Sequence, residues 1–157
     1  MQHIALYQPQ IAPNTGNIIR LCANTGATLH LIHPLGFVWD DRRLRRAGLD
    51  YAEYARICHH DDWAAFCAAT AGQTLWALTT KGRRSLYNAR FGADDVLLFG
   101  SETAGLPESV HAALDPAQKL RLPMQETSRS LNLSNTAAIV LYEAIRQNLP
   151  ADTATNL

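Results

Sequence analysis

The sequence predicts an α/β fold: a single domain with helices on both faces of a mainly parallel sheet. Short apolar segments alternate along the chain with segments of helical periodicity. Several of these apolar segments end in loops rich in glycine or hydroxyl residues, which is typical of the ligand-binding edge of open α/β sheets. The chain has 157 residues, 47% of them hydrophobic and 18% charged, which is enough for one globular domain with a core.

The N-terminal part of the chain predicts a strand, a helix and a second strand. His3–Tyr7 is an apolar strand that Pro9 closes. A helix opens at Asn14, and Gly26 is a favourable residue for its C-terminal stop. Thr28–His33 is the second strand. Two strands separated by a helix are the repeating unit of a parallel sheet.

The remaining elements are expected to alternate in the same way. Further strands are expected at Arg56–His59, Leu75–Leu78, Asp95–Phe99 and Leu120–Leu122. Helices are expected within Trp39–Gly48, after a cap at Asp61, at Pro107–Leu114 and at Ser134–Gln147. The chain has no repeat or linker, so we expect one domain over residues 1–157, with a frayed tail after about residue 150.

Composition excludes several classes of protein. No apolar run approaches the roughly 18 residues that span a bilayer, and the N-terminus lacks the pattern of a secretory signal. Cys22, Cys58 and Cys67 lie in apolar surroundings without a C-x-x-C pair, which is typical of reduced core thiols in a cytoplasmic protein. The formal net charge is zero, so nucleic-acid binding would have to rest on a local patch.

The loops at the predicted strand ends are candidates for a ligand pocket. Gly100–Gly105 has the glycine spacing of a P-loop, but Leu106 and Pro107 replace the Lys-Ser/Thr pair that holds phosphate and magnesium. No G-x-G-x-x-G follows the first strand, which disfavours a dinucleotide site. The pattern favours a neutral or cationic nucleoside held by backbone groups. The alternative is that Gly100 and Gly105 only serve tight turns.

Three motifs, in this order, resemble those of the SPOUT RNA 2′-O-methyltransferases. They are NTGNIIR at Asn14–Arg20, LFGSETAGLP at Leu98–Pro107, and LPM with SLNLS at Leu122–Met124 and Ser130–Ser134. With WDDRRLRRAGLDY and LTTKG between them, the chain is similar to the small TrmL (YibK) branch of that family from its first strand to its last helix. Three motifs in register are far more specific than any one of them alone.

The resemblance implies a C-terminal trefoil knot, a homodimer, and S-adenosyl-L-methionine as the methyl donor, with S-adenosyl-L-homocysteine as its product and no metal. It also implies methylation of the ribose 2′-hydroxyl at the wobble nucleotide, position 34, a cytidine or modified uridine of leucine tRNAs. The expected partner is therefore the anticodon stem-loop of leucine isoacceptors. Two alternatives stay open: methylation of another RNA, such as ribosomal RNA, and a non-catalytic RNA-binding factor with the same fold.

The cofactor pocket that the resemblance implies is built mainly from the strand-end loops. Its candidate residues are Leu78, Thr79, Gly100, Glu102, Gly105, Leu122, Met124, Ser130, Leu131 and Asn132. Backbone groups would bind the adenine edge, apolar side chains would enclose the ring, and Ser130 would bind near the methionine part.

The resemblance also implies four candidate catalytic residues, Arg20, Tyr142, Asn14 and Glu102. Arg20 is either the base or a clamp that binds phosphate and stabilises the attacking oxygen, since a guanidinium hardly ever loses its proton. Tyr142 is either catalytic or a residue that simply packs its ring. Asn14 and Glu102 are expected to hold loops, or the arginine, in place.

A cluster of basic residues is the candidate RNA surface. Its members are Arg42, Arg43, Arg45, Arg46, Lys81, Arg83 and Arg84, with His59 and Arg129 as further candidates. A charge run is usually a solvated face, and Asp40 and Asp41 partly offset this one. Clustering on a neutral protein nevertheless favours phosphate contacts. Metal binding at Cys58–Asp62 is not expected, because adjacent ligands point in different directions.

Overall fold

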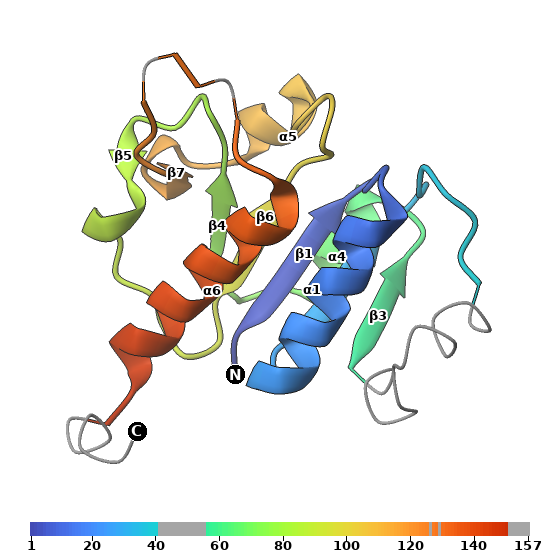
Figure 1. Cartoon of the computed structure of the whole chain (residues 1–157), viewed down its shortest axis with the longest axis horizontal. Helices are drawn as coiled ribbons and strands as arrows, with labels where there is room; N and C mark the ends of the chain where they lie inside the picture. The colour runs from blue at the N-terminus through green and yellow to red at the C-terminus, as the bar shows by residue number, and fades with distance from the viewer. Residues whose placement is uncertain (41–55, 126, 129, 151–157) are drawn as a thin grey trace.

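One parallel sheet forms the centre of the molecule (Figure 1). The computed structural model describes residues 1–40, 56–125, 127–128 and 130–150. In this part of the chain the sheet has the order β3-β2-β1-β6-β4-β7-β5, with every neighbouring pair parallel. The strands are β1 (His3–Tyr7), β2 (Thr28–Ile32), β3 (Ile57–His60), β4 (Leu75–Leu78), β5 (Arg84–Ser85), β6 (Val96–Phe99) and β7 (Lys119–Arg121).

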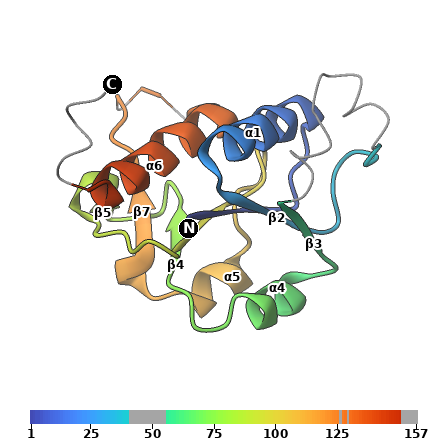
Figure 2. The same ribbon diagram turned by 90° about the horizontal axis from the view of Figure 1, so that it is seen from below.

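Helices cover both faces of this sheet. They are α1 (Ala12–Thr25), α4 (Trp63–Ala69), α5 (Glu108–Ala113) and α6 (Leu133–Asn148), with short 3-10 turns η1 (Leu86–Asn88) and η2 (Pro116–Gln118). Figure 2 shows α1 and α6 on one face and α4 and α5 on the other. Along β6 the side chains alternate between two buried clusters, with Leu97 and Phe99 toward α1 and α6 and Leu98 toward α5. The predicted α/β class is confirmed.

The structure shifts some of the predicted element limits. Asp62, not Asp61, caps α4, because its carboxylate accepts a hydrogen bond of 2.8 Å from the backbone nitrogen of Ala65. The strand expected at Arg56–His59 runs from Ile57 to His60. The prediction missed β5, η1 and η2, which are too short to carry a periodic pattern. The helix expected within Trp39–Gly48 and the tail after residue 150 lie largely or wholly outside the described residues.

The cysteines are placed differently from one another. Cys22 is buried in α1, as predicted, but Cys58 and Cys67 are exposed. The expectation of core thiols is therefore wrong for these two. The physical reason for Cys58 is that β3 is an edge strand, a position that the local sequence does not reveal.

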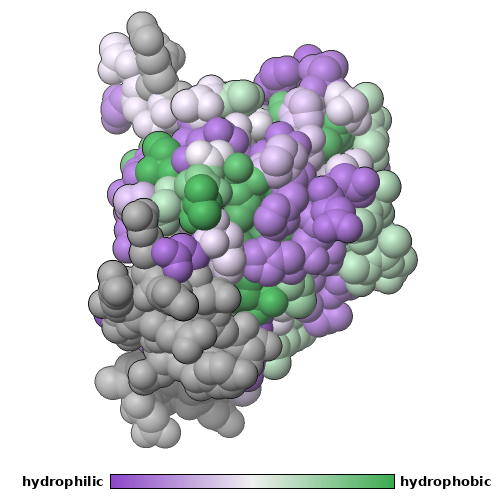
Figure 3. All heavy atoms as spheres, turned by 90° about the vertical axis from the view of Figure 1, so that its right-hand side faces the viewer, coloured by the Kyte–Doolittle hydropathy of each residue, from purple (hydrophilic) through white to green (hydrophobic). Residues whose placement is uncertain are grey.

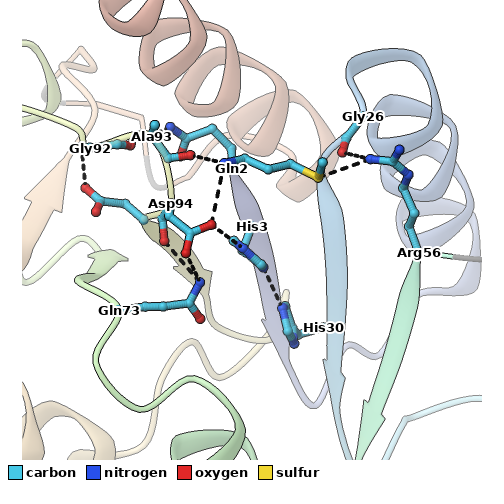
Figure 4. Close-up of polar contacts among 11 residues, drawn as sticks. Gln2, His3, Gly26, His30, Arg56, Gln73, Gly92, Ala93 and Asp94 are labelled. Atoms are coloured by element: carbon cyan, nitrogen blue, oxygen red, sulfur yellow. Dashed lines mark hydrogen bonds and ion pairs between the residues drawn. The ribbon is translucent and has the colours of Figure 1, made fainter.

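A chain of polar side chains joins β1, β2 and β3, and Figure 4 shows its part from Asp94 through His3 to His30. Nε2 of His3 lies 3.1 Å from Oδ1 of Asp94, and Nδ1 of His3 lies 3.0 Å from Nε2 of His30. Nδ1 of His30 lies in turn 2.9 Å from Nε2 of His60. Phe66 of α4 packs its ring edge-on against His30 and His60. These contacts link β1, β2 and β3 to one another, and none of them involves the loops that line the ligand-binding edge of the sheet.

The surface carries no uniform character on the side that Figure 3 displays, where hydrophobic and hydrophilic residues lie interspersed. Among the described residues, no helix is both long enough and apolar enough to cross a membrane.

Candidate functional site

A cavity of about 530 Å³ lies at the carboxyl ends of the strands, in the size range of small-molecule sites. It forms there because β6, β4 and β7 are adjacent in the sheet, so that the loops that follow them meet. The starts of α1 and α6 complete the wall through Asn14 and Leu133.

The structure brings together every residue that the sequence assigned to the cofactor pocket. The cavity is lined by Leu78, Thr79, Gly100, Glu102, Gly105, Leu122, Met124, Ser130, Leu131 and Asn132. Asn14 lines it too. Sequence reasoning missed Arg121, which also lines the cavity. Its signal was its place within the strand predicted at Leu120–Leu122, directly before the motif LPM.

The backbone of the loop after β6 packs closely against itself in the cavity wall. Ser101 and Gly105 exchange two backbone hydrogen bonds of 3.2 and 2.9 Å, which close the loop on itself. A Cβ on Gly100 would lie 2.7 Å from the Cα of Gly105, and closer still to the carbonyl carbon of Gly105 and the nitrogen of Leu106. Gly105 has a φ of +66°, a conformation that glycine adopts without strain. Both glycines are therefore required by the geometry of this loop.

Glu102 fastens that loop to the start of α1. Its Oε2 accepts a hydrogen bond of 2.7 Å from the backbone nitrogen of Gln10, and its Oε1 accepts one of 3.1 Å from that of Ile11. Helix α1 has no side-chain cap of its own, so the carboxylate supplies the negative charge that a helix N-terminus favours. Both oxygens of Glu102 accept hydrogen bonds, which anchors the loop after β6 to the start of α1.

Asn14 and Asn132 extend this connection to α6. Nδ2 of Asn14 donates to Oε1 of Glu102 over 3.2 Å, and Oδ1 of Asn14 accepts from Nδ2 of Asn132 over 3.0 Å. The Oδ1 of Asn132 caps α6 by accepting hydrogen bonds from the backbone nitrogens of Ser134 and Asn135. One continuous chain of hydrogen bonds thus joins the first motif, the second motif and the third.

Arg20 and Tyr142 lie outside the cavity. Arg20 is on the exposed side of α1, and its guanidinium makes no hydrogen bond or ion pair with a described residue. Tyr142 is on α6 with 55% of its surface exposed. Helices α1 and α6 pack against each other. The structure of one chain therefore does not bring these two candidate catalytic residues together with Asn14 and Glu102 at the cavity.

The candidate RNA-binding residues differ in whether their side chains contact other residues of the protein. Nζ of Lys81 pairs with the exposed Oε2 of Glu108 at 3.0 Å. Arg84 donates to the backbone oxygen of Asn88 at 2.5 Å and lies 5.6 Å from the centre of the Trp76 ring. Arg84 is thus held against the protein, whereas Arg83 is exposed.

Other candidates of that set give less information. His59 is exposed, and its Nδ1 lies 2.8 Å from Nε2 of His33. Arg42, Arg43, Arg45, Arg46 and Arg129 lie outside the described residues. Among the described residues, no group of three or more histidine, cysteine or acidic side chains is arranged to hold a metal ion.

Comparison with known proteins gives a family and two kinds of relatives. The model of the SpoU rRNA methylase family matches residues 1–142. A tRNA (cytidine(34)-2′-O)-methyltransferase of Methylovorus glucosotrophus is 57% identical over 148 residues, which is 94% of this chain and 96% of that protein.

Two solved structures with the same fold are also described in connection with methylation. One, from work on the 2′-OH methylation of C/U34 on tRNA, has a TM-score of 0.86 and 46% identity, and covers 94% of this chain and 96% of its own. Another is the SpoU methyltransferase AviRb of Streptomyces viridochromogenes in complex with the cofactor AdoMet. It has a TM-score of 0.79 and 25% identity, and the match covers 93% of this chain and 57% of AviRb.

Proposed function

This chain belongs to the SpoU rRNA methylase family, and from this premise we propose that it transfers a methyl group from S-adenosyl-L-methionine to the ribose 2′-hydroxyl of nucleotide 34 of tRNA. The observation that carries the proposal is the cavity where the loops after β4, β6 and β7 meet. The relative of 57% identity supports the choice of substrate, because it is named a tRNA (cytidine(34)-2′-O)-methyltransferase and the match covers nearly its whole length.

The cavity suits a nucleoside with an amino-acid side arm. Leu78, Leu122 and Leu131 offer apolar surface for a ring, and Thr79 and Ser130 offer hydroxyls. Gly100 lets the loop after β6 pack closely on the backbone of Gly105 and Leu106, which shapes this wall of the cavity. These features fit S-adenosyl-L-methionine, which AviRb binds as its cofactor. When bound, the cofactor supplies a methyl group that its positive sulfur has already activated.

Because the methyl donor is activated, the protein's part is positioning and charge stabilisation. A ribose hydroxyl is a very weak acid, so it gains from a hydrogen-bond partner or from a nearby positive charge as it attacks. We propose that Arg20 supplies that charge and binds phosphate, and that Tyr142 assists through its hydroxyl. Glu102 and Asn14 position the loops in this proposal, because their polar atoms are already engaged with each other.

A homodimer is part of the same proposal. Arg20 and Tyr142 stand on the exposed sides of α1 and α6, away from the cavity of their own chain. Ile139, 39% exposed on α6, adds apolar surface close to Tyr142 that a second copy would cover.

We also propose cytoplasmic leucine tRNAs as the substrates, with the nucleotide cytidine or modified uridine and no metal required. We propose in addition that the C-terminal part of the chain forms the trefoil knot that the family resemblance implies.

One experiment tests the activity. The protein is incubated with methyl-labelled S-adenosyl-L-methionine and either total tRNA or ribosomal RNA, and the labelled nucleotide is mapped. We expect label at position 34 of leucine tRNAs and none in ribosomal RNA. Arg20→Ala should abolish transfer while leaving cofactor affinity nearly unchanged, and Arg146→Ala, an exposed arginine paired with Glu143, is the control. Cofactor binding without transfer to any RNA would leave a non-catalytic RNA-binding factor as the better account.

A further inference from the structure

Strand β7 presents two cations on one face of the sheet. Leu120 is buried in the cluster that packs under α1 and α6. Since side chains alternate along a strand, Lys119 and Arg121 point to the opposite face, the side of α5. The electrostatic effect of Lys119 on His111 of α5 agrees with this placement, since Lys119 is among the charges that lower the pKa of His111 after burial and Lys81.

The chain before β5 brings a third cation to the same edge. Arg84 pairs with Leu120 in the sheet, and Ser85 with Arg121, so the register carried back by one residue sets Arg83 opposite Lys119. Gly82 lies directly against this part of β7, since a Cβ there would be 2.7 Å from the carbonyl oxygen of Leu120. Arg83 is exposed. Figure 1 shows β5 and β7 side by side at the edge of the sheet.

Within the part of the chain that the structure describes, these three cations differ from their neighbours in having no hydrogen-bond or ion-pair partner. Lys81 is paired with Glu108, and Arg84 is held by Asn88 and the Trp76 ring. The side chains of Arg83, Lys119 and Arg121 make no hydrogen bond or ion pair with any residue that the structure describes. A phosphate can bind such groups without first breaking an ion pair, which favours binding.

Arg121 connects this edge to the proposed active site, because it also lines the cavity. We propose that Arg83, Lys119 and Arg121 form a docking edge for the phosphate backbone of the RNA substrate, next to the point where the target nucleotide enters the cavity. This inference rests on the proposed function and adds to it the path of the RNA. The partner is an RNA strand, since three cations that lie beside a nucleoside pocket, and that have no ion-pair partner among the described residues, complement the repeating charge of a phosphate backbone.

The test uses Arg83→Gln, Lys119→Gln and Arg121→Gln, singly and combined, in the full-length protein. The affinity for tRNA is measured as a function of salt concentration, and the affinity for S-adenosyl-L-methionine is measured by calorimetry. We expect each single variant to lower tRNA affinity by about threefold or more and to reduce the slope of log affinity against log salt by about 1. Lys119→Gln and Arg83→Gln should leave the cofactor affinity unchanged, because neither residue lines the cavity.

Arg90→Gln is the matched control, with the same change of charge at the other end of the molecule. The backbone nitrogen of Phe91, next to Arg90, donates to Oε1 of Gln147 near the last turn of α6, whereas the cavity lies at its first turn. This variant should keep the salt slope and the tRNA affinity of the wild type.

Two results with the variants would overturn the docking edge, and one result with the wild type would do so as well. One is a combined variant with wild-type tRNA affinity and salt slope, in which case methyl transfer by the wild type still upholds the proposed function. The other is a loss confined to cofactor affinity in Arg121→Gln, which would assign Arg121 to the carboxylate of the cofactor. A wild-type protein that binds no RNA would refute both the docking edge and the proposed function.

Discussion

Asn14 and Glu102 are 88 positions apart in the sequence, yet Nδ2 of Asn14 donates a hydrogen bond of 3.2 Å to Oε1 of Glu102. Oδ1 of Asn14 accepts from Asn132 at the cap of α6. The amide of Asn14 is therefore the central link between the loop after β6 and the loop before α6. Through this link, the position of one loop depends on the position of the other.

Replacing Glu102 with glutamine tests whether both carboxylate oxygens are needed. The side chain meets only donors, namely the backbone nitrogens of Gln10 and Ile11 and the amide of Asn14. A glutamine NH₂ group would face one of them, so we expect Glu102→Gln to lower the free energy of unfolding by about 1–3 kcal/mol. Urea denaturation measures this. Glu108→Gln, which alters an exposed carboxylate, should change it by less than about 0.5 kcal/mol, and an equal effect of the two would contradict the anchoring role.

Two replacements of Asn132 separate its capping role from its link to Asn14. Asn132→Asp keeps an oxygen that caps α6 but loses the Nδ2 donor, whereas Asn132→Ala loses both. We expect the alanine variant to lose about 1 kcal/mol or more of stability, and the aspartate variant to lose less. Both should bind S-adenosyl-L-methionine more weakly, as calorimetry would detect. Wild-type cofactor affinity in Asn132→Asp would show that the link does not shape the cavity.

The family motifs predicted the residues of the cavity wall correctly, whereas hydrophobic periodicity misplaced some limits of the surrounding helices and strands. Leu78, Gly100 and Leu122 follow or end strands that the sequence marks by short apolar runs. Because strands of a parallel sheet end at the same edge, their loops could be expected to meet there. Family motifs then supplied the residues of the wall, all of which line one cavity.

Other features could not be read from the sequence, because they depend on the order of the strands. The pairing of Lys81 with Glu108 and the contact of Arg84 with Trp76 join residues that no local pattern connects. Both residues were predicted to face RNA, and both are engaged within the protein. The exposure of Cys58 depends in the same way on the edge position of β3.

Gly100 and Gly16 offer a matched pair of glycine-to-alanine replacements. A methyl group on Gly100 would overlap the backbone of Gly105 and Leu106, so the loop after β6 would have to move. We expect Gly100→Ala to weaken S-adenosyl-L-methionine binding by about tenfold or more and to cost about 1–3 kcal/mol of stability. Gly16 lies in α1 with nothing within 4 Å of its Cβ position. Gly16→Ala should therefore stabilise the protein by up to about 1 kcal/mol.

Thermal unfolding and calorimetry of both variants decide the matter. A Gly100→Ala protein with wild-type cofactor affinity would mean that the loop after β6 does not approach the ligand.

The histidine chain across β1, β2 and β3 predicts how stability depends on pH. Burial, and then the nearby His3 and His60, lower the pKa of His30 to about 4 from its ordinary value of 6.5. The pKa of His60 is also lowered, first by burial and then by His33. Below pH 6.5 the unfolded chain binds protons that the folded protein does not, so stability is lost as the pH falls. At about 1.4 kcal/mol per pKa unit, His30 alone accounts for roughly 3 kcal/mol between pH 7 and pH 4.

Urea denaturation at a series of pH values measures this slope. His30→Asn removes the central ring of the chain, and we expect it to flatten the decline between pH 7 and pH 4.5, whatever it does to stability at pH 7. His59→Asn removes an exposed histidine that is not part of this chain, and it should retain the wild-type decline. The three rings bond in one consistent direction when each is neutral and carries its proton on Nε2, with Asp94 accepting from His3. An additional proton on His30 breaks that order, so an unchanged slope in His30→Asn would refute the chain as the source of acid sensitivity.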